Sequence, residues 1–169
     1  MADTGRSEEL ENLMELYGDE IKRFCTLQLR DPFQAEDAAQ DTFVKAWKAL
    51  DTFRNESSQK TWLMHIAVNT CRDYQRTGWF RHMDRRITPD MLPETETRPE
   101  EKDESLTVAI MELPVKLREV ALLCWLQGFT YLEAAEALGI SHQAVSSRLN
   151  RARRKLRFAL EGSDDHDPA

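Results

Sequence analysis

Apolar residues recur at intervals of three and four along the first part of the chain, the spacing that gathers them on one face of an α-helix. One such stripe runs from Glu8 to about Leu29 and stops at Asp31-Pro32, because proline lacks the backbone N–H that a helix interior needs. A second stripe starts near Gln34, and a third runs from about Gln59 to Arg76 after a polar break. The pattern predicts three helices in one compact N-terminal bundle.

Each predicted helix has its own core-facing set of apolar and small residues. In the first helix the set is Leu10, Leu13, Met14, Tyr17, Ile21, Phe24 and Cys25. In the second helix it is Ala35, Ala38, Ala39, Thr42, Phe43, Ala46, Trp47 and Leu50. In the third helix it is Trp62, Leu63, Ile66, Ala67, Thr70, Cys71 and Tyr74. The small residues of the second helix permit close helix packing.

The helical pattern stops in the middle of the chain. From Thr88 to Glu104 the sequence TPDMLPETETRPEEKDE has three prolines, a surplus of carboxylates and no apolar periodicity. Such a segment cannot bury enough apolar surface to order itself. It predicts a flexible acidic linker between two domains.

Beyond the linker the helical pattern returns from Val115 to Gln127 and ends at Gly128, a residue suited to stop a helix. Thr130 and Glu133 then have the spacing of a capping box, in which each side chain caps the other's backbone N–H. The spacing predicts a short helix from Tyr131 to Leu138.

A turn at Gly139-Ile140 follows this short helix, and Ser141 is placed to cap a long helix from His142 to about Leu160. A short capped helix, a turn with glycine and a second helix together have the layout of a helix-turn-helix. The buried stripe of the long helix contains Val145, Leu149, Ala152 and Leu156. Its other faces present Gln143, Ser146, Ser147, Arg148, Asn150, Arg151, Arg153, Arg154, Lys155 and Arg157.

Charge is distributed unevenly along the chain. The net charge is −7, yet the segment from Leu113 to Leu160 holds eight basic and three acidic residues. From His142 to Leu160 there is no carboxylate, so the arginines there lack the intrahelical partners of an ordinary solvated, salt-bridged face. This favours contacts with base edges and phosphates of DNA.

Composition narrows the class of protein further. With 41% hydrophobic and 31% charged residues, the chain is typical of a helix-rich globular protein. No run approaches eighteen apolar residues, and the start from Met1 to Glu11 is polar and acidic, which predicts a cytoplasmic location. Cysteines and histidines show no ligand spacing, and no phosphate loop or nucleophile-base pair is present, so we expect neither metal, cofactor nor enzyme activity.

Two segments carry a resemblance to a known family. AEDAAQDTFVKAWKALDTFRNESSQKTWLMHIAVNTCRDYQR resembles region 2 of the extracytoplasmic-function (ECF) sigma factors of RNA polymerase, and LPVKLREVALLCWLQGFTYLEAAEALGISHQAVSSRLNRARRKLR resembles their region 4. The resemblance implies an all-α fold with an N-terminal helix bundle and a C-terminal helix-turn-helix domain. The expected bounds are 1–86 for region 2, 87–108 for the linker, 109–161 for region 4 and 162–169 for an acidic tail.

The resemblance also implies partners. A sigma factor binds core RNA polymerase through the beta-prime clamp coiled coil and the beta subunit, and directs promoter recognition and DNA melting. The family's clamp-binding motif maps here onto Asp37, Gln40 and Asp41, whose carboxylates and amide can pair with basic side chains. Acidic residues early in a helix also favour its dipole, which is the alternative explanation.

The family places a base-capturing pocket beside the loop before its third helix. The matching residues are Phe53 and Asn69, with Trp62 at the edge of melting, and a core role for Trp62 is an equal alternative. Arg72 and Arg76 begin a basic cluster suited to nearby phosphates, which continues through Arg81, Arg85 and Arg86 between the aromatic residues Tyr74, Trp79 and Phe80. The upstream promoter element is expected to contact Gln143, Ser146, Ser147, Arg148, Asn150, Arg151 and Arg154.

Two positions depart from the family pattern. Asn55 stands where the loop commonly has glycine, although asparagine tolerates left-handed geometry better than most residues. Ser146 occupies a position of the recognition helix where many relatives carry a basic residue, which leaves the base preference open.

The resemblance adds two further expectations and leaves one rival. The acidic linker is expected to mimic a polyanion inside the polymerase channel, with simple solubility as the alternative, and an anti-sigma factor is an expected partner. The rival is a conventional duplex-binding regulator with an N-terminal effector or dimerisation domain. It explains Thr130 to Arg157 equally well, but it leaves the base-capture residues and the acidic second helix unexplained.

Overall fold

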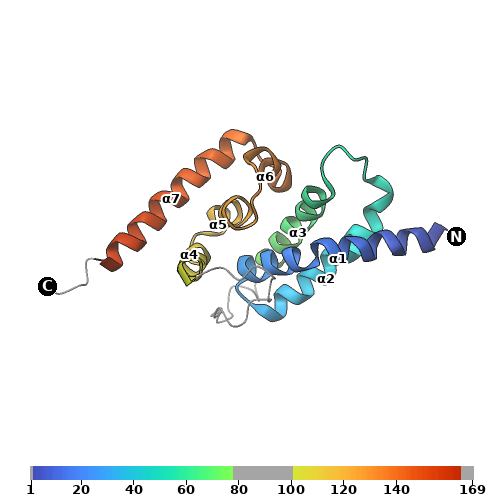
Figure 1. Ribbon diagram of the computed structural model, residues 1–169, viewed down its shortest axis with the longest axis horizontal. Coiled ribbons are helices and arrows are strands. Elements are labelled where there is room, and N and C mark those ends of the chain that lie inside the picture. Colours follow the sequence, from blue (N-terminus) through green and yellow to red (C-terminus); the bar gives the residue numbers. More distant parts are fainter. Residues whose placement is uncertain (1, 78–100, 165–169) are drawn as a thin grey trace.

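The computed structural model describes residues 2–77 and 101–164. Within these two stretches the chain forms α-helices, one short 3-10 helix and one π-helical turn, and it contains no strand. Figure 1 shows the helices in two groups, one from each stretch, that lie against each other. The predicted all-α fold with two helical regions is confirmed.

The N-terminal group contains α1 (Ala2–Leu29), α2 (Pro32–Ala49), the 3-10 helix η1 (Leu50–Thr52) and α3 (Gln59–Arg76). α1 packs against both α2 and α3, and α2 packs against α3. The bounds of α3 are those that the apolar spacing predicts, and Ser58 caps it by accepting a hydrogen bond from the backbone N–H of Thr61. The predicted three-helix bundle is confirmed.

α1 begins at Ala2, earlier than the apolar stripe that starts near Glu8. Its first turns are held by Arg6, whose Nη2 donates to the carbonyl of Trp47 at 2.7 Å and whose guanidinium stacks over the Trp47 ring. Arg6 Nη1 also pairs with Asp51 at 3.1 Å. These contacts join α1 to residues far away in the sequence. The apolar spacing within α1 therefore does not predict that the helix extends to Ala2.

α2 begins at Pro32 rather than near Gln34. Proline is accommodated at the first helical position because its missing N–H lies among the unpaired donors of a helix start. Asp31 precedes it as the cap, and Oδ1 of Asp31 accepts from the backbone N–H groups of Phe33 and Gln34. The Asp-Pro pair therefore starts this helix as well as ending the one before it.

The loop between η1 and α3 makes its turn at Asn55. The backbone of Asn55 has φ 58°, in the left-handed region that favours glycine and that asparagine tolerates better than most residues. Asparagine thus meets the conformational demand at a position where glycine is common, and the loop carries Phe53 back toward α3.

The C-terminal group contains α4 (Glu101–Met111), α5 (Val115–Ala121), the π-helical turn η4 (Leu122–Leu126), α6 (Tyr131–Leu138) and α7 (His142–Asp164). α5 packs against α7, and α6 packs against both. α4 begins within the segment 87–108 that the sequence predicts as linker, so that prediction is too long at its C-terminal end. The last proline of the linker segment is Pro99, and the residues from 101 to 111 that follow it are compatible with a helix.

The start and stop signals of the C-terminal group are confirmed. Gly128 has φ 71° and Gly139 has φ 67°, so both chain reversals use the conformation that glycine adopts freely. Thr130 and Glu133 form the capping box, with each side chain accepting from the other's backbone N–H. Ser141 Oγ accepts from the backbone N–H of Ala144, as expected for the cap of α7.

Most of the predicted core-facing residues are buried or half-buried, including the whole stripe of α7. The prediction is wrong for Met14, which is 48% exposed. Met14 instead lines an open groove between α1 and α2. No helix in the described stretches is long and apolar enough to span a bilayer.

The two groups share one contact region. α3 packs against α6, and α1 packs against α5 and η4. In Figure 1, α5 and α6 lie beside α3 and the C-terminal end of α1. Buried apolar residues of both groups belong to one continuous core cluster. Polar side chains add specific contacts across this region, which are described with the sites below.

Candidate polymerase- and DNA-binding surfaces

The first candidate surface is the outer face of α2. Asp37, Gln40 and Asp41 are all exposed, while the residues on the opposite side of this helix are buried against α1 and α3. Oδ2 of Asp41 accepts a hydrogen bond of 2.7 Å from the hydroxyl of Tyr74 on α3. The predicted clamp-binding residues therefore form one solvent-facing acidic patch.

Tyr74 reports the electrostatics of this patch. Burial raises the pKa of its hydroxyl, and the hydrogen bond to Asp41 and the nearby charge of Asp37 raise it further. Tyr74 therefore remains a neutral donor across the neutral pH range. It orients one oxygen of Asp41, and no partner of the other oxygen is found among the residues that the structure describes.

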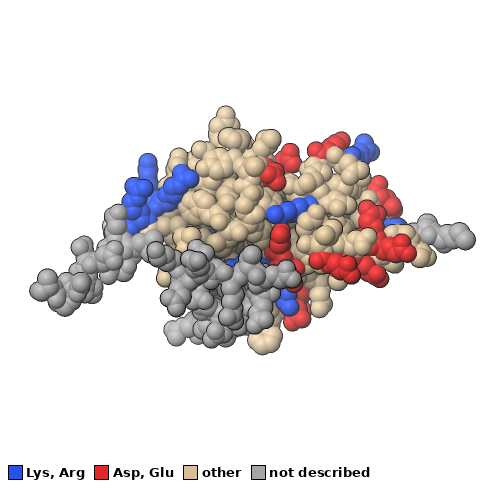
Figure 2. All heavy atoms as spheres, viewed as in Figure 1, with Lys and Arg blue, Asp and Glu red and all other residues tan. Residues whose placement is uncertain are grey.

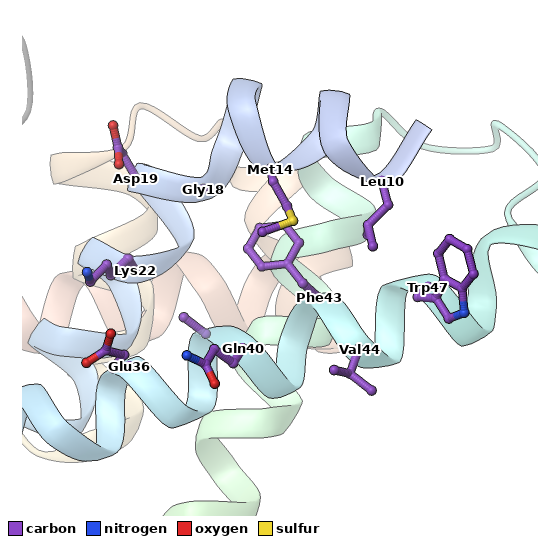
Figure 3. A pocket seen from close by; sticks show the side chains of 11 residues that line it. Leu10, Met14, Gly18, Asp19, Lys22, Glu36, Gln40, Phe43, Val44 and Trp47 are labelled. Atoms are coloured by element: carbon purple, nitrogen blue, oxygen red, sulfur yellow. The ribbon is translucent and has the colours of Figure 1, made fainter. Parts of the chain in front are cut away.

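An apolar groove of about 560 Å³ lies beside the acidic patch, between α1 and α2. Figure 3 shows Met14 and Phe43 at its centre, with Leu10 and Trp47 at one end. Gln40 lines the groove and also belongs to the acidic patch. The apolar spacing assigns most of these residues to the core, so the groove is a feature that sequence analysis missed.

The second candidate surface lies on α3 and the loop before it. Phe53 and Trp62 come together with ring centroids 4.8 Å apart and planes inclined by 38°. Both rings are half-buried. Trp62 therefore packs partly against the core and keeps part of its ring exposed to solvent. The structure thus places Trp62, which is expected at the edge of melting, against Phe53 of the predicted base-capture pocket.

Asn69 and Arg72 lie further along α3, on the face that meets α6. Asn69 Nδ2 donates to Nε2 of His65 at 3.2 Å, and His65 Nδ1 donates to the carbonyl of Ala137 on α6 at 2.9 Å. Arg72 Nη1 lies 3.5 Å from Asn69 Oδ1. These polar side chains are half-buried and engaged with their neighbours.

Arg72 spans the boundary between the two groups of helices. Its Nε and Nη2 donate to the two carboxylate oxygens of Glu119 on α5 at 3.0 and 3.2 Å, a bidentate pair. Nη2 also donates to the carbonyl of Leu138 at 3.0 Å. The Glu119 side chain is only 3% exposed, so its charge is matched by Arg72 within the protein. Arg72 therefore also caps the C-terminal end of α6.

Arg118, the residue before Glu119, also bonds across the boundary between the two groups of helices, in this case to α1. It is buried, and its Nη2 and Nε donate to the backbone and side-chain oxygens of Gln28, at 2.6 and 3.1 Å. Gln28 lies in the last turn of α1, so a cation of α5 meets the carbonyl end of that helix. Sequence analysis missed both Arg118 and Glu119 because they lie among apolar residues of a predicted core helix.

Arg76 is exposed, and its pair with Asp73 at 3.3 Å lies at the surface. Its guanidinium is therefore accessible to a binding partner. The remaining members of the predicted basic cluster, Arg81, Arg85 and Arg86, lie outside the described residues. Trp79, Phe80 and the acidic residues Glu94, Glu96 and Glu100 lie there too.

The third candidate surface is α7. Gln143, Ser147, Asn150, Arg151 and Arg154 are exposed, and Ser146 and Arg148 are half-buried. None of the ion pairs found in the described stretches involves α7. On the face shown in Figure 2, Lys and Arg gather over α7, while Asp and Glu gather over the N-terminal group. The predicted recognition face therefore points outward with its arginines free of carboxylates.

Arg153 differs from its neighbours on α7. Its guanidinium lies 5.8 Å from the ring centroid of Trp125, and it donates to the hydroxyl of Tyr131 at 3.4 Å and to Oδ1 of Asn150 at 3.3 Å. These contacts join α7 to η4 and α6. Arg153 thus has a packing role within the helix-turn-helix in addition to its charge.

The cysteines lie in the protein interior. Cys25 and Cys71 are buried, and burial together with a hydrogen bond from the Cys71 thiol to Cys25 raises the pKa of Cys71. Cys124 is half-buried, and burial raises its pKa to about 11. A raised thiol pKa means little reactive thiolate at neutral pH.

Comparison with known proteins agrees with this architecture. A family model described as sigma-70 region 2 matches residues 13–81, and one described as sigma-70 region 4 matches residues 103–156. The RNA polymerase sigma factor NccH of Alcaligenes xylosoxydans xylosoxydans is 36% identical and covers 76% of this chain and 74% of its own. YlaC of Bacillus subtilis, another RNA polymerase sigma factor, is 32% identical over 95% of this chain and 96% of its own.

Solved structures give the same result for the fold. CnrH, in complex with the cytosolic domain of CnrY, has a TM-score of 0.70 and 27% identity, and covers 94% of this chain and 92% of its own. The sigma factor RpoE, in complex with the anti-sigma factor NepR from Bartonella quintana, has a TM-score of 0.75 and 25% identity, and covers 91% of this chain and 98% of its own. The chain therefore belongs to the RNA polymerase sigma factors of the ECF class, which recognise promoters.

Proposed function

We propose that this sigma factor divides promoter recognition between its two helical regions. α7 reads the upstream element as duplex DNA, and the α3 face captures the downstream element after melting. One observation carries the first half of the proposal most strongly: the exposed arginines of α7 have no carboxylate partner in the described structure, while the buried stripe fixes that face toward solvent. The comparisons give no support to a conventional duplex-binding regulator.

The residues of α7 suit two different kinds of contact. Arg151, Asn150 and Gln143 have the planar or forked donors and acceptors that recognise base edges in the major groove. Arg154 and Arg148 supply charge for phosphates. Ser146 and Ser147 are small enough to permit close approach of the helix to the groove and can bond either bases or phosphates.

For the downstream element we propose that Phe53 and Trp62 stack against an unpaired base. Their contact forms an aromatic wall at the edge of the loop. Asn69 supplies hydrogen bonds to the flipped base, and Arg72 and Arg76 bind the adjacent phosphates. This assignment is supported by the placement of all five residues on α3 or the loop before it.

Core polymerase is proposed to bind the acidic patch and the adjoining groove together. Met14 and Phe43 line the groove, where they would receive apolar side chains of a clamp helix. Asp37 and Asp41 would pair with the basic ones. The proposed contact with the beta subunit rests on the family resemblance alone.

The chain is proposed to act without a catalytic step of its own and in the cytoplasm, where polymerase and promoters are found. An anti-sigma factor is a further proposed partner. Its support is the similarity over nearly the whole chain to CnrH and RpoE, each of which was solved in a complex with its own partner.

The proposal is tested by transcription with purified core polymerase, with and without this chain, on genomic DNA fragments. We expect transcripts that start at a shared pair of sequence elements only when the chain is present. Binding of duplex DNA without promoter-specific initiation would instead favour the regulator. An anti-sigma factor should co-purify with the chain from uninduced cells and suppress these transcripts, and its addition without effect would remove that part of the proposal.

A further inference from the structure

We propose that Arg6 is a positioning residue for base capture, because it fixes the end of α2 and η1 and, through them, the loop that carries Phe53. This role rests on the proposed function of Phe53 and Trp62 in holding the melted downstream element. The match to sigma-70 region 2 begins at residue 13. Arg6 therefore lies in a stretch of α1 that precedes the part of the chain matched by the family.

One guanidinium makes three contacts with the end of α2 and with η1. Nη2 of Arg6 donates to the carbonyl of Trp47 at 2.7 Å, and Nη1 pairs with Oδ2 of Asp51 at 3.1 Å. The guanidinium carbon lies 5.0 Å from the centroid of the Trp47 ring. Trp47 is in the last turn of α2, where the final carbonyls have no partner within the helix. A cation that bonds one of them also interacts favourably with the helix dipole.

The geometry distinguishes this arginine from an ordinary surface ion pair. The Asp51 side chain is 70% exposed, and a pair with so exposed a carboxylate contributes little by itself. The forked guanidinium of Arg6, however, bonds the Trp47 carbonyl and the carboxylate at the same time, and the Trp47 ring packs against it. Trp47 thus holds Arg6 in place, and Arg6 in turn holds Asp51.

η1 connects Arg6 to the base-capture loop. Asp51 is the middle residue of this short helix, and the backbone N–H of Phe53 closes the turn by donating to the carbonyl of Leu50 at 3.3 Å. The Phe53 ring then meets Trp62, with centroids 4.8 Å apart. A displacement of η1 would therefore carry the Phe53 ring away from its place beside Trp62.

The loop depends on its two ends for its order. Arg54, Asn55 and Glu56 are exposed, so burial contributes little to holding them. The far end is fixed by Ser58, which caps α3, and the near end is fixed by η1. Loss of Arg6 lowers the fraction of molecules in which the loop is placed for capture. The apparent affinity for an unpaired base falls by the same fraction.

The test uses holoenzymes reconstituted from core polymerase and full-length variants, on a promoter found by the transcription experiment. Arg6→Ala removes all three contacts. Arg23→Ala is the matched control, because Arg23 is a half-buried cation of the same helix that lies about 25 Å further along its axis. Base capture is measured by permanganate reactivity of the downstream element and by binding of a single-stranded oligonucleotide with its non-template sequence. Affinities for core polymerase and for upstream duplex DNA are measured beside it.

We expect Arg6→Ala to lower oligonucleotide binding and permanganate reactivity about three- to tenfold, and Arg23→Ala to stay within about twofold of the wild type. Affinities for core polymerase and upstream duplex should stay within about twofold in both variants, which a general loss of folding would not allow. Arg6→Lys keeps the charge without the fork and should lie between Arg6→Ala and the wild type. Equal capture by the Arg6→Ala and Arg23→Ala variants, or an equal loss of core affinity and capture in Arg6→Ala, would overturn the proposal.

A double-mutant cycle tests the route through η1. Asp51→Ala should reduce capture in the wild-type background and have little further effect in the Arg6→Ala background, because its partner is already absent. Losses that simply multiply would contradict this route. A wild-type holoenzyme that opens no promoter would refute the proposed function, whereas equal opening with and without Arg6 would refute only its positioning role.

Hydrogen exchange in the free chain measures the loop without DNA. Arg6→Ala should speed exchange of the Phe53 amide by about threefold or more, while amides of α3 such as that of Leu63 keep their wild-type rates. Unchanged exchange at Phe53 would rule out the positioning role, even in a variant with reduced promoter opening.

Discussion

The hydroxyl of Tyr74 on α3 donates a hydrogen bond to Oδ2 of Asp41 on α2, at 2.7 Å. This bond connects α2, which is proposed to bind polymerase, to α3, which is proposed to bind the melted downstream element. Because Tyr74 fixes one oxygen of Asp41, the carboxylate presents the other oxygen to solvent in a defined direction. The relationship gives a direct test of the acidic patch.

Tyr74→Phe removes the hydroxyl and retains the ring. We expect the affinity for core polymerase to fall by about two- to fivefold, because Asp41 loses its orientation but keeps its charge. The measurement is fluorescence titration of labelled chain with core polymerase. Tyr17→Phe is the matched control, since no hydrogen bond of that hydroxyl is found within the described ranges; an equal loss in both variants would argue against a specific role for the Asp41 contact.

Charge reversal tests the patch more severely. Asp37→Lys with Asp41→Lys should weaken binding to core polymerase by at least about tenfold, because basic partners would then be repelled. Both residues are exposed, so helical content should not change. Reversal of Asp3 and Glu8, also exposed, gives the same change in net charge elsewhere on the chain. A folded Asp37/Asp41 variant with unchanged affinity would assign polymerase binding to another face.

The loop that carries Phe53 depends on the left-handed backbone of Asn55. Asn55→Val should destabilise the fold by about 1–2 kcal/mol, because a branched side chain disfavours that conformation. Asn55→Gly should be at least as stable as the wild type, and Glu56→Val, without a positive φ, is the control. Urea unfolding followed by circular dichroism measures all three. Tolerance of valine at position 55 would show that the left-handed turn does not form.

Two arginines of α7 should behave differently on upstream duplex DNA. Arg151→Ala should cost about 1–3 kcal/mol and relax the preference at one or two base pairs if it contacts a base edge. Arg157→Ala should weaken all sequences alike and lower the salt slope by about one unit. Arg153 is a poorer phosphate probe than the sequence suggests, because its loss also removes contacts with Trp125 and Tyr131. Identical salt slopes and specificities for the Arg151 and Arg157 variants would contradict this division.

Local signals explain which parts of the fold could be predicted. The bounds of α3, the capping box of Thr130 and Glu133, and the turns at Gly128 and Gly139 each depend on residues within a few positions of one another. Helix propensities and the spacing of apolar residues predict such local interactions directly. The predicted buried stripe of α7 is confirmed for the same reason, since its period is a property of one helix.

The missed features depend on residues far apart in sequence. Glu119 lies in a helix whose apolar neighbours predict core, and only the fold shows that its partner is Arg72. Met14 has the correct spacing for the core of α1, but it lies in the groove between α1 and α2, which the spacing within one helix cannot show. The contact between the two regions could not be predicted from either region alone, because each polar group has its partner in the other region.

The most direct test of the proposed division of labour compares Asn69→Ala with Arg151→Ala in reconstituted holoenzymes. Upstream duplex binding and permanganate reactivity of unpaired thymines in the downstream element are measured on the same promoter. Asn69→Ala should bind upstream duplex like the wild type and show reduced permanganate reactivity, whereas Arg151→Ala should lose upstream binding first. If Asn69→Ala opens the promoter normally and Arg151→Ala alters only opening, the assignment of capture to α3 and duplex reading to α7 is contradicted.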